Sequence, residues 1–157
     1  MRLNKILIAL LIAGMLTCSF SAVFAEDGTL SDGTTVPIPE GYSILDTGSG
    51  IFTLATEDQQ TVITVIPDAT ADADQAKETQ VAGGAEFVSQ ETIQINGVDV
   101  IEQKFTKESL NLSGYLFTYN DKNYVVTFTS TGDNDATDAA NPVNIIITSL
   151  TGGAAEE

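Results

Sequence analysis

The side chains of this chain that could take part in chemistry are almost all carboxylates. The sequence has 22 Asp and Glu residues, six Lys and Arg residues and one Cys, and it has no His and no Trp. Without an imidazole, nucleophilic catalysis with a histidine base is excluded. A serine–lysine pair is formally available, but no Ser-x-x-Lys spacing occurs anywhere in the sequence. The chemistry open to the chain is therefore mainly the chemistry of carboxylates.

Clustered acids point to a hard cation as the first candidate ligand. Asp133, Asp135 and Asp138 lie close together in one acidic segment, and carboxylate oxygens suit Ca²⁺ or Mg²⁺. A second cluster comprises Asp68, Asp72 and Asp74. The first cluster is not an EF-hand loop, because Asp138 and Asn144 stand where that loop has Gly and Glu. We predict Asp133, Asp135 and Asp138 as metal ligands and expect no other cofactor. The alternative is that these residues simply favour turns and helix caps.

Two further sites follow from residue type and position. Glu91 and Glu102 lie on neighbouring predicted strands, and a carboxylate pair is what a glycoside hydrolase needs. The alternative is a pair of solvated charges on strands, since the chain has no Trp on which a sugar could stack. Asn111-Leu112-Ser113 is an N-glycosylation sequon, so Asn111 is a predicted glycosylation site in an exported chain.

Residues 1–25 have the pattern of a secretory signal peptide. Arg2 and Lys5 precede an apolar run over residues 6–15, and the segment ends Val23-Phe24-Ala25 before the acidic pair Glu26-Asp27. We predict cleavage after Ala25 and a secreted, cell-surface or periplasmic location, without membrane insertion after cleavage.

Two alternatives to cleavage stay open. Residues 6–24 are near the lower length limit for a bilayer span, so the leader could be retained as an anchor. Lipidation of Cys18 is disfavoured, because Thr17 stands where a lipoprotein signal normally has Gly or Ala. Cleavage after Ala25 would remove Cys18, the only cysteine, and with it any disulfide or thiolate site.

The charge of the chain restricts its partners. Its formal net charge is −16, and beyond Ala25 the 22 acids face only four lysines, a balance of −18. Nucleic-acid phosphates and anionic lipid surfaces would be repelled, so neither is an expected partner. The same charge keeps the chain soluble and strains its compact state by self-repulsion.

The hydrophobic pattern predicts a short lead, one domain and a short tail. We assign residues 26–35 to a flexible lead, residues 36–150 to a single α+β domain and residues 151–157 to a disordered tail. About 130 residues are enough to bury one core without cross-links.

Most of the predicted domain alternates like strands. Strand patterns cover residues 50–56, 61–66, 91–106, 112–120 and 123–131. Asn96-Gly97 interrupts the third range and is typical of a type I′ hairpin turn. Tyr115, Phe117, Tyr119, Tyr124 and Phe128 alternate on two of these strands. They form either a partner-binding sheet face or, as we favour, the core beneath a helix.

Two segments read as helices. Asp72 or Asp74 is a candidate N-cap for a helix that runs to about Val81 and ends at Gly83-Gly84, with a thin apolar surface. Asn141-Pro142 is a strong helix start. The residues Val143, Ile146, Ile147 and Leu150 then have helical i, i+3, i+4, i+7 spacing. Because β-branched residues are mediocre helix formers, a strand over 143–150 is the alternative.

The order of these features resembles the PsbP-like α/β superfamily, including its small secreted prokaryotic members. The resemblance rests on the leader, the segment Pro39-Glu40-Gly41-Tyr42, a hairpin and helix, the strand that ends Ile95-Asn96-Gly97, an aromatic hairpin and the final Asn-Pro-led helix. It implies a central antiparallel sheet of about five to six strands with one or two helices packed on it. It also implies a generic role as an exported accessory or binding domain.

The sequence therefore predicts a non-enzymatic extracytoplasmic domain that binds a protein or a cell-envelope component. A carboxylate-based hydrolase, with or without a divalent cation, is the first alternative. A Ca²⁺- or Mg²⁺-binding surface protein is the second.

Overall fold

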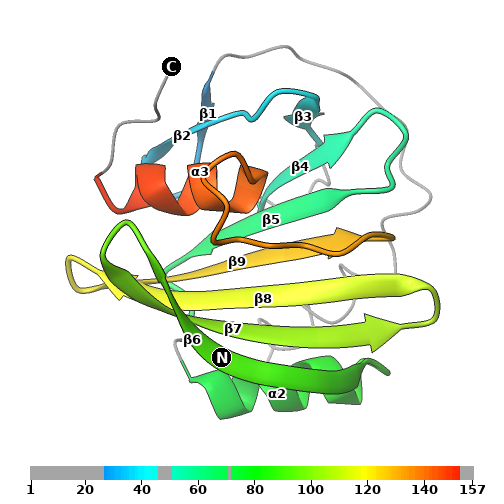
Figure 1. Ribbon diagram of the computed structural model, residues 1–157. Helices are drawn as coiled ribbons and strands as arrows, with labels where there is room; N and C mark the ends of the chain where they lie inside the picture. Colours follow the sequence, from blue (N-terminus) through cyan, green and yellow to red (C-terminus); the bar gives the residue numbers. More distant parts are fainter. Residues whose placement is uncertain (1–26, 46–50, 71, 153–157) are drawn as a thin grey trace.

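A seven-stranded antiparallel sheet forms the centre of the molecule (Figure 1). The computed structural model describes residues 27–45, 51–70 and 72–152, so the predicted leader, residues 1–25, lies outside the described residues. In spatial order the strands are β3 (Tyr42–Ile44), β4 (Phe52–Thr56), β5 (Val62–Pro67), β9 (Lys122–Ser130), β8 (Leu110–Tyr119), β7 (Val98–Lys107) and β6 (Glu86–Ile95). The predicted α+β class with a central antiparallel sheet is confirmed, but the sheet is larger than the five to six strands expected.

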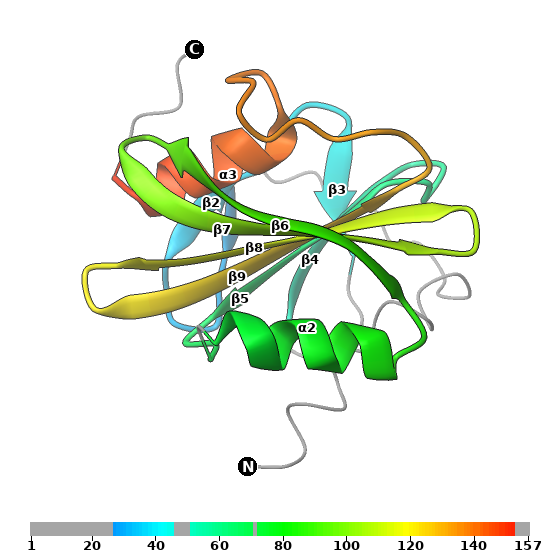
Figure 2. The ribbon, with the colours of Figure 1, turned by 60° about the horizontal axis from the view of Figure 1, so that its bottom comes forward.

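The two faces of this sheet carry different layers (Figure 2). Helix α2 (Ala73–Ala82) crosses one face near β6 and β7. Helix α3 (Pro142–Leu150) covers the other face together with a small two-stranded sheet of β1 (Asp27–Thr29) and β2 (Thr35–Pro37). No helix in the described part of the chain is long and apolar enough to cross a bilayer.

Strand β1 and the turn after it lie in residues 26–35, for which the sequence predicts a flexible lead, and β2 begins at Thr35. The chain turns at Gly33 (φ 87°), whose N–H donates to the carbonyl of Leu30 at 3.0 Å. Leu30 and Val36 are then buried in the main core. The segment is ordered because these two apolar residues complete the core beside α3, a contact that only the tertiary structure supplies.

Helix α3 provides the apolar layer on its face of the sheet. Asn141 caps the helix by accepting a hydrogen bond from Val143 N at 2.9 Å, and Pro142 occupies the first turn. The four apolar residues of the predicted stripe are all buried: Val143, Ile146, Ile147 and Leu150. Here the helix prediction is confirmed over the strand alternative, because burial of the whole stripe outweighs the weak helix propensity of the β-branched residues.

The alternating aromatics lie beneath α3 and not on a free face. Tyr115, Phe117, Tyr124 and Phe128 are at most 6% exposed, and Tyr119 packs partly buried against the same core. Phe117 and Tyr124 stack at 5.3 Å between ring centroids. The core interpretation of these residues is confirmed, and the partner-binding alternative is not supported.

Two hairpin turns set the register of the long strands. Asn96 (φ 49°) and Gly97 (φ 74°) have the positive φ values of the predicted type I′ turn between β6 and β7. Asn120 (φ 50°) and Asp121 (φ 62°) do the same between β8 and β9. Because both turns are tight, four consecutive ten- or nine-residue strands pair almost without slippage.

An ion pair joins the β1–β2 turn to the β8–β9 turn. The carboxylate of Asp32 lies 2.9 Å from Lys122 Nζ, and the Asp32 side chain is only 8% exposed. The hydrogen bond from Lys122 lowers the pKa of Asp32 to about 2. A pKa that is lower in the folded state stabilises the fold above the ordinary value of 3.8 and ceases to do so near pH 2.

We predict that Asp32→Asn lowers the free energy of unfolding at pH 7 by about 1–2 kcal/mol, after allowance for solvent at the half-exposed lysine. The difference from the unmodified protein should shrink as the pH falls from about 4 to about 2, because the native carboxylate is then protonated. Urea unfolding followed by circular dichroism at pH 7, 4 and 2.5 measures this. The exposed neighbour Asp121→Asn is the control. A loss that is equal at all three pH values would contradict the assignment.

Candidate functional site: the pocket beneath helix α2

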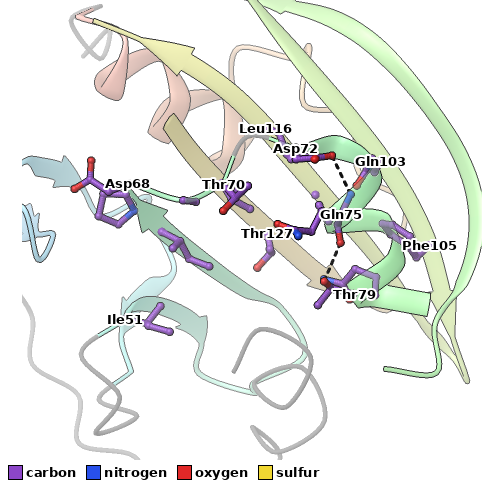
Figure 3. A pocket seen from close by; sticks show the side chains of 17 residues that line it. Ile51, Asp68, Thr70, Asp72, Gln75, Thr79, Gln103, Phe105, Leu116 and Thr127 are labelled. Atoms are coloured by element: carbon purple, nitrogen blue, oxygen red, sulfur yellow. Dashed lines mark hydrogen bonds between the residues drawn. The ribbon is translucent and has the colours of Figure 1, made fainter. Parts of the chain in front are cut away.

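A pocket of about 380 Å³ lies between helix α2 and the sheet (Figure 3). That volume is within the range of small-molecule sites, about 300–1,000 Å³. Strands β5, β7, β8 and β9 supply the floor, and α2 with the segment before it supplies the roof and rim. We call this the α2 pocket.

Strand register creates the floor of the α2 pocket. One row of paired residues crosses the sheet on this face, and all of its members are polar or small: Gln90, Gln103, Gly114, Thr127, Thr64 and Thr53. At its centre a side chain on Gly114 would meet nothing within 4 Å of its Cβ atom. Because Gly114 has no side chain, space is left over the sheet on its α2 face, whereas the opposite face beneath α3 is filled.

Apolar side chains flank this row. Leu116, Val125 and Ile66 form the next register row on one side, and Phe105 lies on the other. The pocket thus has an apolar floor with one polar row across it, which is the usual composition of a binding site for a small organic molecule.

Helix α2 is a lightly attached roof. Asp72 caps it by accepting a hydrogen bond from Gln75 N at 3.1 Å, as predicted, and Gly83 ends it. None of its residues is buried. Side chains from the sheet hold both of its ends, because Gln103 Nε2 donates to Ala73 O at 2.7 Å and Lys107 Nζ donates to Gly83 O at 2.8 Å.

A third contact lies outside the pocket. Lys77 Nζ sits 3.7 Å from the centre of the Phe87 ring, a cation–π contact. Phe87 in turn packs edge-on against Phe105 at 5.7 Å between ring centroids. Polar and cation–π contacts, and not apolar burial, therefore keep α2 over the sheet.

Gln103 is the most buried polar group of the pocket, with 1% of the residue exposed. Its Nε2 also donates to Gln90 Oε1 at 2.8 Å. A main-chain carbonyl such as Ala73 O can only accept, so the amide nitrogen must face it and the orientation of the Gln103 amide is determined.

The acids near this pocket belong to the second cluster seen in the sequence. Asp68, at φ 53°, and Asp72 line the pocket, whereas Asp74 is exposed in the first turn of α2 and does not. The lining includes no Lys. Figure 3 shows Asp68 on the opposite side of the pocket from Asp72 and Gln103.

Two of the three predicted metal ligands are engaged in loop turns. Asp135 accepts hydrogen bonds from Thr137 N at 3.0 Å and from Thr137 Oγ1 at 2.6 Å, which lower the pKa of Asp135. Asp138 accepts from Ala140 N at 2.9 Å. Asp133 is exposed. Among the described residues no three acidic side chains converge as a metal site, so Asp133, Asp135 and Asp138 stay a prediction that this geometry does not support.

The sheet brings Glu91 and Glu102 together as direct cross-strand partners on β6 and β7. Glu91 is exposed, but Glu102 is only 4% exposed and its carboxylate lies 3.2 Å from Lys104 Nζ. The α2 pocket includes neither residue. A buried carboxylate that is paired with an ammonium group is a structural arrangement, so this geometry does not support the predicted hydrolase pair.

The same face carries a buried polar network. Asn134 Nδ2 donates to the Tyr115 hydroxyl, and Asn141 Nδ2 donates to Asn134 Oδ1 at 2.6 Å. Burial raises the pKa of Tyr115. The network ties the acidic loop to β8 and to the start of α3, which explains why this loop is ordered around a predominantly apolar core.

The predicted glycosylation site has a structural role of its own. Asn111 Nδ2 donates to Gly132 O at 3.1 Å, and the residue is partly exposed. A glycan would be attached to the same nitrogen that donates to the loop. Glycosylation of Asn111 stays a prediction.

Three comparisons place the chain among known proteins. A scan against protein-family models finds no match, and a search of curated proteins finds none. Among solved structures, the chain is similar to the solution structure of cyanobacterial PsbP (CyanoP) from Synechocystis sp. PCC 6803, with 14% sequence identity and a TM-score of 0.49. The similarity covers 76% of this chain and 89% of that chain. It is a similarity to a protein of the superfamily that the sequence resembles, and at this identity we draw nothing about function from it.

We predict that Gln103→Leu loosens helix α2 without unfolding the sheet. The substitution removes both amide hydrogen bonds, including the one that holds the first turn of α2. The local cost should be about 1–3 kcal/mol. Hydrogen exchange followed by mass spectrometry should therefore show about tenfold or greater loss of protection in residues 73–82.

Gln94→Leu, which changes an exposed glutamine on β6, is the control. Strands β8 and β9 should keep their protection in both variants. Equal loss in α2 and in these strands would show that Gln103 supports the whole fold, and would contradict the prediction.

Proposed function

We propose that this chain is an exported, non-enzymatic binding domain and that the α2 pocket is its binding site. One observation carries the proposal: a pocket of about 380 Å³ with an apolar floor, one row of polar groups and a roof that buries none of its own residues. A roof held by a few polar contacts can admit a ligand at low cost, because little apolar burial must be undone.

The ligand that suits this pocket is a small molecule with an apolar body. Leu116, Val125, Ile66 and Phe105 offer apolar contact, and Gln103 with Thr127 of the floor offers hydrogen bonds. The sequence leads us to expect a protein or cell-envelope component as the partner, and the size of the pocket favours a small envelope component.

Hydrogen bonding makes three carboxyl groups unsuited to act as a catalytic acid. They are those of Asp32, Asp58 and Asp135, whose pKa values all depart from the ordinary value. Each of these pKa values is lowered, mainly by a hydrogen bond to the carboxylate. A catalytic acid needs the opposite shift.

The formal serine–lysine pair is also engaged in another contact. Register places Ser113 opposite Lys104 on neighbouring strands, which is the formal serine–lysine pair. The Lys104 ammonium group, however, lies against the Glu102 carboxylate. This lysine is therefore engaged in an ion pair and is not free to serve as the base for Ser113.

The binding proposal predicts that filling the pocket abolishes ligand uptake. The probe is N-phenyl-1-naphthylamine, an uncharged apolar dye whose fluorescence rises in apolar surroundings. The unmodified protein should bind it with saturable enhancement. Gly114→Leu should weaken binding at least tenfold, or by about 1.4 kcal/mol, because the new side chain occupies the open space over the floor.

The matched control is Gly132→Leu, which adds the same side chain in open space in the loop after β9, away from the α2 pocket. Thermal unfolding of both variants shows that the fold is intact. Unchanged dye binding by Gly114→Leu, or no saturable binding by the unmodified protein, would contradict the proposal.

Export has a separate test. N-terminal sequencing of the protein recovered from the extracytoplasmic fraction should begin at Glu26. Substitution Ala25→Arg should abolish cleavage and leave a product heavier by the mass of the leader, because a signal peptidase needs a small residue at that position. Recovery of a chain that begins at Met1 from the cytosol would refute export while leaving the binding proposal open.

A further inference from the structure

The side chain of Gln103 offers a hydrogen-bond acceptor at the first turn of α2. The hydrogen bonds of the Gln103 side chain use only its nitrogen, toward Ala73 O and Gln90 Oε1. Its carbonyl oxygen Oε1 makes neither of these bonds. Since no buried side-chain oxygen of the described residues lacks a partner, Oε1 is an acceptor that solvent or a ligand can reach. A ligand with a hydrogen-bond donor can therefore bond to it.

Negative charge lies beside this acceptor. Asp72 is adjacent to Ala73, whose carbonyl Gln103 contacts, and Asp68 lies across the pocket. The partial positive charge of the α2 N-terminus offsets part of one carboxylate, since Asp72 is its cap. Lys122 is close enough to interact with Asp68, but its ammonium group is engaged with Asp32 at 2.9 Å.

No lysine or arginine is among the residues that line the pocket. The pocket lining contains two carboxylates and no Lys, and the whole chain has 22 acids against six basic residues. A field of this sign raises the local concentration of positive ligands and repels negative ones. The accessible acceptor, the charges at the rim and the overall field thus agree.

We infer that the α2 pocket selects an apolar compound that carries a protonated amine. The apolar body lies over Leu116, Val125 and the open space at Gly114. The ammonium group donates to Gln103 Oε1 within the field of Asp72 and Asp68. This inference rests on the proposed binding function and adds the chemical class of the ligand.

Three probes with the same carbon skeleton test the choice of head group: 4-phenylbutylamine, 4-phenylbutanol and 4-phenylbutyrate. Each is titrated at pH 7 against protein that has bound N-phenyl-1-naphthylamine. The amine should displace the dye at a concentration at least tenfold lower than the alcohol does, and the carboxylate should displace it least. The preference for the amine should fall as the salt concentration rises, because screening weakens the field at the rim.

Asparagine variants test which carboxylates cause the preference for the amine. Asp72→Asn removes the charge and keeps the helix cap, since Asn caps as well as Asp. Asp68→Asn removes the charge and tolerates the positive φ. Each should reduce the amine-over-alcohol preference three- to tenfold and leave alcohol binding unchanged. Asp133→Asn, an exposed acid outside the pocket lining, is the control and should leave the preference unchanged.

The outcomes separate this inference from the proposed function. Equal displacement by all three probes, or displacement led by the carboxylate, overturns the inference while the binding function stands. A preference for the amine that persists in both pocket variants also overturns it. Failure of the dye itself to bind overturns the proposed function and the inference together.

Discussion

Burial of a single helix face against the sheet is the interaction on which this structure depends. Helix α3 buries Val143, Ile146, Ile147 and Leu150 against the aromatic side of β8 and β9. The same core collects Leu30 and Val36 from the small β1–β2 sheet, so the N-terminal part of the described chain is ordered by the C-terminal helix. These contacts join segments that are more than a hundred residues apart and are lost together if α3 is undocked.

The opposite face of the sheet does not bury an apolar helix face. With the core satisfied on the α3 side, the α2 side carries a row of amides, threonines and a glycine between its apolar residues. Helix α2 has no buried residue to contribute and is held by contacts such as the one from Lys107 to Gly83 O. The α2 pocket is thus a consequence of asymmetric packing: one face is filled for stability, and the other retains space.

The acidic composition acts differently on the two faces. On the α3 face, the buried acid Glu102 is paired with Lys104, and Asp32 near the edge of the core is paired with Lys122. On the α2 face, Asp68 and Asp72 line a pocket that has no lysine. Two of the four lysines beyond Ala25 therefore neutralise structural carboxylates, and the pocket keeps a negative rim.

Local patterns alone determined a large part of this architecture. The helical spacing after Asn141-Pro142, the Asn96-Gly97 turn and the strand alternation each have a physical cause within a few residues, and each is present as expected. The acids of residues 133–138 show the limit of such reasoning, because clustering along the chain did not make them converge in space. Only the tertiary structure decided that Gln103, Gly114 and Thr127 form one row, since that row depends on the pairing of three strands. The sequence carries each of these residues as an ordinary strand position. Their alignment under α2 arises from strand register. Register depends on the hairpin turns and on which face of each strand is buried in the core.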